Sequence, residues 1–433
     1  MSSSNKPLEK WWLVRRPKIH VTIPISVLAS YVLFCTYSSF TDADEVSLSS
    51  SIITSSILSL SLFWLAFRLE GWYYDTSILF LDNLLCMYMH VSQTLTFLTH
   101  LNPHDGPDSV KTISECRNKL NNNLDFIWKA AWKKQYTHEE IKIPNGLEPS
   151  ITLQILRPVN HPLPRSPDSE HIDSHIQSLP LVLWIHGGGH CLGTSKDSGI
   201  TVLTEALSEH DEPALIVSVE YRLAPEHVYP AAADDCIHTY EWLCQNASAL
   251  GADLNRMAVA GISAGGNLAA IVHQHAARHN LPLKYAGLLI PEVNVSGPGA
   301  LDWAYVENGR CAALPTELMA WFMNCYCPDP ERDATNPKCS PLFFETDNKQ
   351  DVKDEVYKRL ASCLVVTNSA DALRDCGLKY IQKLEKVMKK SRSEAQVDTF
   401  MVKGSHSFGL LTDRNTVKKA MRVFIQRLFD DHI

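Results

Sequence analysis

The stretch that most constrains this chain is Met257–Asn267, which reads Met-Ala-Val-Ala-Gly-Ile-Ser-Ala-Gly-Gly-Asn. An apolar run passes through Gly261, Ser263 and Gly265 into a small-residue helical pattern, which predicts a strand, a sharp turn and a helix. A serine between two glycines at such a junction is typical of a nucleophile elbow, because glycines tolerate the strained backbone and leave the hydroxyl exposed. An ordinary glycine-rich turn also fits these five residues when they are taken alone.

Composition limits what kind of chain surrounds this elbow. The 433 residues are 45% hydrophobic and 20% charged, which suits one large globular domain with an N-terminal extension. A net charge of −8, without a dense basic run in the body, argues against a nucleic-acid partner. The 12 cysteines form no paired C-x-x-C knuckles, so they indicate neither a zinc module nor a disulfide miniprotein. They leave room for one or two disulfides, whose pairing stays open.

The N-terminus carries a predicted membrane anchor. Residues Ile19–Thr41 contain no charge, and basic residues precede them while acidic residues follow. This stretch is long enough to cross a bilayer core of ~30 Å, and the flanking charges favour a cytoplasmic N-terminus. No clean small-residue cleavage site follows. We therefore expect a cytoplasmic tail and an uncleaved signal anchor over residues 1–45.

The next segment, residues 46–135, is predicted to hold a Ser-rich apolar part and N-terminal cap helices. Val46–Phe67 is also uncharged but rich in serine, which favours a segment lying at the membrane interface. The main domain would then face the lumen of the endoplasmic reticulum, whereas a second span would place it in the cytosol. Two glycosylation sequons, at Asn246 and Asn294, agree mildly with a lumenal domain.

A second glycine-rich loop follows a predicted buried strand at 181–185. The strand runs directly into His-Gly-Gly-Gly-His at 186–190. Without side chains, the backbone N–H groups of Gly187 and Gly188 can approach one oxyanion, to which the N–H of Ala264 in the elbow also points. The rest of this motif is His186 and Gly189. A phosphate cradle is the rival interpretation, but no Gly-Lys-Ser/Thr follows.

Three motifs together carry a family resemblance. They are His-Gly-Gly-Gly at 186–189, Tyr-Arg-Leu-Ala-Pro-Glu at 221–226, and the elbow with its helix at 261–270. In order and spacing the chain resembles the hormone-sensitive-lipase-like branch of the α/β-hydrolases, and within it the arylacetamide deacetylase and neutral cholesterol ester hydrolase group. The resemblance implies a mostly parallel central sheet flanked by helices over residues 136–433, with a helical cap insertion at 296–354. One departure is Ile262, where that group commonly has Asp.

The same resemblance selects two partners for the serine. Asp371 lies just beyond the predicted strand Ser362–Thr367, and His406 follows the next predicted strand, Gln396–Val402. Acid after one strand and histidine after the next is the chain order of this fold. Ser263, Asp371 and His406 are therefore the predicted catalytic triad.

This resemblance implies a membrane-anchored serine carboxylesterase or lipase that hydrolyses lipophilic acetyl or acyl esters. We expect no metal ion, no organic cofactor and no obligate protein partner, while membrane lipid would surround the anchor. Two alternatives stay open. One is an amide deacetylase of the arylacetamide type, and the other is a hydrolase-fold binding protein that has lost catalysis.

Overall fold

The computed structural model describes residue 117 and the ranges 135–144, 150–161, 178–197, 199–210, 213–296, 308, 314, 316–344, 350–408 and 412–430. The predicted anchor at 1–45 lies outside them, as does the segment at 46–135 apart from Arg117 and Gln135. Within the described ranges, none of the helices combines the length and apolar character needed to cross a bilayer.

One sheet of eight strands organises the described chain, in the order β1-β2-β4-β3-β5-β6-β7-β8. The β1–β2 and β2–β4 pairs are antiparallel and all other neighbours are parallel. The sheet is thus mostly parallel, as expected. The strands are β1 Tyr136–Ile143, β2 Ile151–Pro158, β3 Leu179–Ile185, β4 Leu215–Glu220, β5 Ala252–Ile262, β6 Tyr285–Leu289, β7 Ser362–Asn368 and β8 Val397–Val402.

The central strands are buried on both faces. Every residue of β3, β6 and β7 is buried, which explains why these strands read as continuous apolar runs rather than as alternating ones. Ile185 at the end of β3 pairs with Gly261 near the end of β5. The carboxyl ends of the parallel strands therefore meet at one edge of the sheet, and the loops that follow them lie close together.

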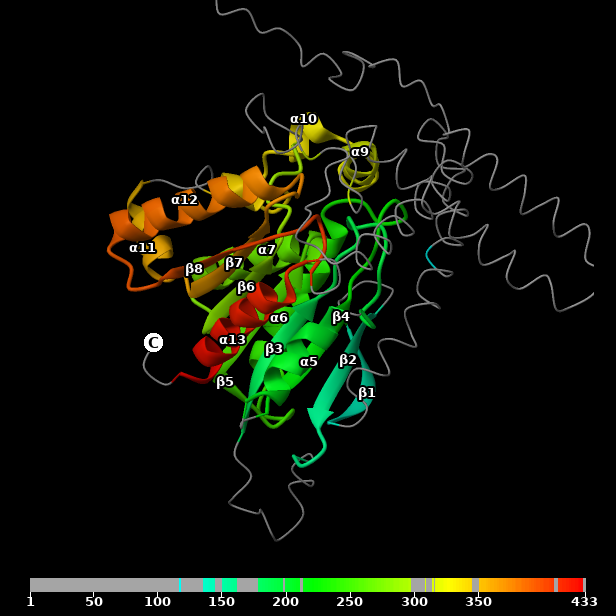
Figure 1. The fold of residues 1–433 in the computed structure, drawn as a ribbon, viewed down its shortest axis with the longest axis vertical. Helices are drawn as coiled ribbons and strands as arrows, with labels where there is room; N and C mark the ends of the chain where they lie inside the picture. The colour runs from blue at the N-terminus through cyan, green and yellow to red at the C-terminus, as the bar shows by residue number, and fades with distance from the viewer. Residues whose placement is uncertain are drawn as a thin grey trace, which may run out of the picture. The chain divides into compact units, whose positions relative to one another are not determined.

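Within the described ranges, five helices cover the two faces of the sheet. They are α5 Ile200–Ser208, α6 Ala231–Asn246, α7 Ala264–His279, α12 Arg374–Ser391 and α13 Arg414–Phe429. Buried residues of α6, α7 and α12 share one apolar cluster with one set of strand side chains, and those of α5 and α13 share a second cluster with the opposite set. Figure 1 shows α5 and α13 crossing the near side of the strands. The fold is thus a helix–sheet–helix sandwich.

The described part of the predicted cap holds short helices. They are α9 Thr316–Tyr326, α10 Pro330–Asp333, the 3-10 turn η2 Pro341–Phe343, and α11 Gln350–Lys358, which continues four residues past the predicted cap boundary at 354. Figure 1 shows α9 and α10 beyond the upper end of the strands. The domain boundaries at 136–433 and 296–354 stay predictions.

Candidate active site

The elbow forms where β5 meets α7. Ser263 has φ 57° and ψ −117°, a strained conformation for a residue other than glycine. A Cβ on Gly261 would lie 2.1 Å from the carbonyl oxygen of Gly265, and a Cβ on Gly265 would lie 2.1 Å from that of Ile185. Both positions therefore require glycine, since neighbouring backbone fills the space that a side chain would occupy.

Hydrogen bonds from three segments fix the backbone of Ser263. Its N–H donates to the carbonyl oxygen of Leu289 at the end of β6, at 2.9 Å. Its own carbonyl oxygen accepts from the N–H of Asn267 at 3.0 Å and from that of Glu292 at 3.2 Å. The strained turn is thus held by β6, by α7 and by the loop after β6.

The glycine loop after β3 lies against this serine. Gly188 and Gly189 have positive φ values of 118° and 60°, and the loop closes through a bond from the N–H of Leu192 to the carbonyl oxygen of Gly188, at 2.8 Å. A Cβ on Gly187 would lie 2.9 Å from the Ile262 carbonyl oxygen and 3.4 Å from the Ser263 Cβ. The backbone of Gly187 therefore borders the nucleophile directly.

The N–H groups predicted to bind an oxyanion are those of Gly187, Gly188 and Ala264. No backbone carbonyl in the described ranges accepts a hydrogen bond from any of the three. Ala264 is the first residue of α7, where an N–H has no partner within the helix. The arrangement leaves these donors free to bind a ligand oxygen beside Ser263.

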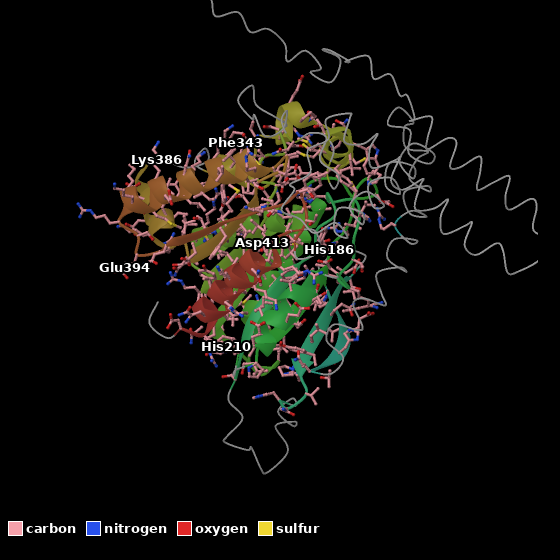
Figure 2. The ribbon with its side chains drawn as sticks, viewed as in Figure 1. His186, His210, Phe343, Lys386, Glu394 and Asp413 are labelled. Carbon is pink, nitrogen blue, oxygen red and sulfur yellow. The ribbon has the colours of Figure 1, made fainter. Side chains whose placement is uncertain are left out.

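The buried ring of His186 holds the backbone of the glycine loop in place. Its ring is fully buried and stacks on Tyr221 with centroids 4.1 Å apart, and its Nδ1 bonds the Gly187 carbonyl oxygen at 2.8 Å. The Tyr221 hydroxyl donates to the His186 carbonyl oxygen at 2.9 Å. Burial lowers the pKa of His186, so the ring is neutral at pH 7. Figure 2 shows His186 within the fold, whereas Glu394 lies at the periphery.

The predicted triad residues come together in one line. The Ser263 Oγ lies 2.8 Å from the His406 Nε2, and the His406 Nδ1 lies 2.8 Å from an Asp371 carboxylate oxygen. Asp371 is buried, and its other oxygen accepts from the N–H of Leu373 at 2.8 Å. Asp371 thus fixes the His406 ring with its Nε2 toward the serine, which is the geometry that general-base activation of a hydroxyl requires.

Asn368, the last residue of β7, holds the histidine loop. Its side-chain amide donates to the carbonyl oxygens of Ser405 and Ser407, at 2.6 and 2.7 Å. These carbonyls stand on either side of His406, and Asn368 is fully buried. Sequence reasoning missed this residue, although a polar side chain at the end of an otherwise apolar strand is a signal that could have revealed it.

A second missed group lies behind the elbow. The buried carboxylate of Glu292 lies 3.7 Å from the Nε2 of His190, and the His190 ring stacks on Tyr326 of α9 with centroids 3.7 Å apart. The side-chain amide of Asn267 bonds the carbonyl oxygen of Glu292 at 2.7 Å. These contacts join the glycine loop, the elbow and the cap helix α9, so His190 has a structural position in the fold.

The ring of Phe322 on α9 lies over the glycine loop. A Cβ on Gly189 would lie only 2.3 Å from this ring, so glycine is needed for the helix to approach so closely. Trp321 and Phe322 are both buried, with centroids 5.3 Å apart. An aromatic side chain of the described part of the predicted cap therefore lies against the glycine loop.

No metal site accompanies this constellation among the described residues, because no group of three or more His, Cys, Asp and Glu side chains there could hold an ion. What the arrangement can do chemically depends on the serine, histidine and aspartate together with free backbone N–H groups. These are the elements of nucleophilic acyl transfer.

Known proteins are similar to this chain in sequence. An AB hydrolase superfamily protein of Schizosaccharomyces pombe is 34% identical over 214 residues, which is 48% of this chain and 58% of that protein. The carboxylesterase NlhH of Mycobacterium tuberculosis is 33% identical over 210 residues, covering 48% of this chain and 61% of that protein. The chain thus spans less than two thirds of the length of these curated relatives.

Solved structures agree with the fold described above. A hyperthermophilic esterase from the archaeon Pyrobaculum calidifontis is 27% identical, with a TM-score of 0.60 over 78% of this chain and 96% of that one. A family model described as alpha/beta hydrolase fold matches residues 182–402, slightly more than half of this chain. The chain therefore belongs to the α/β-hydrolase fold family.

Proposed function

We propose that this protein is a serine carboxylesterase that hydrolyses esters through an acyl-enzyme intermediate. The observation that carries the proposal is the unbroken line from the Ser263 Oγ through the His406 ring to the Asp371 carboxylate, with both contacts at 2.8 Å. The esterase names of several relatives support the same reaction class. Binding alone would not require a base at hydrogen-bond distance from the serine hydroxyl.

The reaction begins when Ser263 attacks the ester carbonyl carbon and His406 Nε2 accepts the hydroxyl proton. Asp371 keeps the imidazole oriented and stabilises its charged form. His406 then donates the proton to the leaving alcohol, which leaves an acyl group on Ser263. Water, activated by the same nitrogen, releases the acid and restores the serine.

The negative charge on the carbonyl oxygen needs donors that are in place before the reaction. We assign this role to the N–H groups of Gly187, Gly188 and Ala264, which border Ser263 and have no backbone acceptor in the described part of the chain. Each such donor contributes roughly 3 kcal/mol to the stabilisation of the transition state in comparable sites. The closeness of the glycine loop to the elbow is therefore part of the proposal.

The substrate class follows from apolar features near the site and at the N-terminus. Phe322 and Trp321 of α9 place aromatic surface next to the glycine loop. The uncharged stretch Ile19–Thr41 would hold the enzyme at a membrane. We therefore propose lipophilic acetyl or acyl esters reached from the membrane of the endoplasmic reticulum, with the catalytic domain in the lumen, as in the arylacetamide deacetylase and neutral cholesterol ester hydrolase group.

An amide substrate is the second candidate within the same chemistry, since it differs in needing firmer protonation of its leaving group by His406. Comparing hydrolysis of matched ester and amide substrates by one enzyme preparation separates the two. An amide rate constant equal to or above that of the ester would replace the carboxylesterase assignment with a deacetylase one.

Replacing the nucleophile tests the proposal. Ser263→Ala is expected to abolish hydrolysis of p-nitrophenyl acetate while the thermal unfolding transition is retained. Ser208→Ala, which changes an exposed serine at the end of α5, serves as the matched control and is expected to keep full activity. Turnover retained by a folded Ser263→Ala protein would exclude the serine mechanism.

A further inference from the structure

Two cysteine pairs flank the last turn of the cap helix α9. Cys191 follows His190 and Cys325 precedes Tyr326, and the rings of His190 and Tyr326 stack with centroids 3.7 Å apart, so the Cys191 and Cys325 thiols come together. Just past the helix, the thiols of Cys327 and Cys339 also interact. All four are free thiols. Sequence spacing leaves these pairings open, whereas the fold brings each pair into contact.

Other contacts hold the same turn of α9 in place. The ring of Tyr326 stacks on His190, and the Tyr326 carbonyl oxygen accepts from the N–H of Tyr229 at 2.8 Å. Cys325 and Cys191 thus meet at a point where the cap helix is already docked to the glycine loop. This docking keeps the two thiols close to each other, which a disulfide requires.

The two thiols of the first pair differ in reactivity. Cys325 is partly exposed, and the hydrogen bond from Cys191 lowers the pKa of its thiol. Cys191 is fully buried, and burial raises the pKa of its thiol. Since the thiolate is the attacking species, Cys325 is the residue suited to react first with a reagent from solvent, and Cys191 is placed to resolve the product.

We propose that Cys191 and Cys325 form a disulfide that fastens the cap helix α9 to the glycine loop, with a small-molecule disulfide such as glutathione disulfide as the oxidant. The Cys325 thiolate attacks one sulfur of glutathione disulfide, giving a mixed disulfide and one glutathione thiolate. Cys191 then attacks the Cys325 sulfur, gives up its proton, and releases the second glutathione. Two protein thiols are oxidised, and one glutathione disulfide is reduced to two glutathione molecules.

The second pair provides an internal comparison. Cys327 and Cys339 are also in contact, but both are buried, at 3% and 0% exposure. Because exchange requires access of the reagent to a sulfur, this pair is expected to stay reduced in the folded protein while Cys191–Cys325 forms. Its two thiols also interact, so a difference in oxidation between the two pairs reports the accessibility of the sulfurs.

Disulfide mapping of the full-length protein tests the proposal. Protein reduced with a phosphine is placed in glutathione disulfide, its free thiols are alkylated, and it is digested with chymotrypsin, which cuts after Tyr326 and so separates Cys325 from Cys327. A Cys191–Cys325 linked peptide is expected in wild type and in Cys244→Ser, which removes another partly exposed thiol. The linked peptide is expected to be absent in Cys325→Ser.

Three results would overturn the proposal. They are both thiols remaining open to alkylation, Cys325 linked to Cys327, and Cys191 linked to any other cysteine. As a second readout, chymotryptic cutting after Phe322 in the folded protein is expected to slow by at least about tenfold on oxidation, because the crosslink restrains opening of α9. An unchanged cutting rate in mapped, oxidised protein would contradict the fastening role. Neither readout measures hydrolysis, so an inactive enzyme would leave both intact.

Discussion

Asn368 positions His406 through the two residues adjacent to the histidine in the chain. The Asn368 side-chain amide donates to the carbonyl oxygens of Ser405 and Ser407. The same β7 strand leads to Asp371, so one strand end positions both the acid and the loop of the base. The orientation of the imidazole thus depends on a buried amide that takes no part in proton transfer.

Replacement of this amide is expected to loosen the histidine. Asn368→Ala leaves two carbonyl oxygens without their donor, which should lower the free energy of unfolding by about 1–3 kcal/mol. A displaced imidazole should lower kcat by at least about tenfold with little change in KM. Steady-state kinetics and urea unfolding measure both effects, with the exposed Asn255→Ala as control. A purely structural Asn368 would lower stability and leave kcat unchanged.

Alanine substitutions at Gly265 and Gly266 are expected to lower the stability of the protein by different amounts. In Gly265→Ala the new Cβ would meet the Ile185 carbonyl oxygen at 2.1 Å, so we expect a loss of more than about 3 kcal/mol of stability and of all activity. In Gly266→Ala the nearest atoms belong to Pro291, at 2.9 Å, and the loss should be smaller. Thermal unfolding compares the two variants, and equal losses would contradict the close approach of β3 to the elbow.

Stability is expected to fall in acid through a buried histidine outside the site. His273 on α7 is fully buried, and burial lowers its pKa to about 4, while an unfolded histidine has a pKa of about 6.5. Between pH 6.5 and pH 4, His273 is therefore protonated in the unfolded chain and neutral in the folded chain. The contribution of His273 is fully present above pH 6.5, and about 3 kcal/mol is lost as the pH falls to 4.

The matched variant for this effect is His273→Gln, whose amide can still donate to the carbonyl oxygen of Ala361, which His273 bonds at 2.9 Å. Urea unfolding between pH 7 and pH 4 measures how steeply the free energy of unfolding falls with pH. In the variant this slope should be smaller by the amount that corresponds to the uptake of about one proton on unfolding. Identical slopes in both proteins would mean that His273 keeps its charge when folded, contrary to this account.

The ring of Phe322 is expected to limit the length of the acyl group that the active site accepts. Phe322→Ala opens space beside Gly189, so the ratio of kcat/KM for a longer p-nitrophenyl acyl ester to that for the acetate should rise by roughly tenfold. Phe429→Ala removes a ring that stacks on His210 at the C-terminal end of α13 and serves as the control. An unchanged ratio in Phe322→Ala would show that α9 does not border the acyl site.

Much of the fold could be predicted because its strands are buried on both faces. The apolar run Leu181–Ile185, and the Cys-Leu-Val-Val run within Ser362–Thr367, identify strands within two residues of the ends of β3 and β7. Strand β5 begins at Ala252, five residues before the predicted Met257, because the polar start Asp253–Asn255 hides it. Residues following the strand ends then meet at one edge of the sheet.

Contacts between loops were beyond prediction. Asn368 bonds residues 37 and 39 positions away, and Glu292 meets His190 across the elbow. Such pairs carry no periodic signal, since their partners are set by how separate loops pack in space. The pairing of Cys191 with Cys325 belongs to the same class. Ile262, at the position where the group it resembles commonly has Asp, places its Cγ2 methyl group 3.4 Å from where a Gly187 Cβ would stand.

Covalent labelling with a fluorophosphonate probe tests the central claim most directly, because the probe reacts only with a serine that a base activates. The account predicts one labelled peptide containing Ser263, no labelling of Ser263→Ala, and labelling of His406→Ala slowed by at least about a hundredfold. No labelling of the folded wild-type protein, or labelling at another serine, would contradict it.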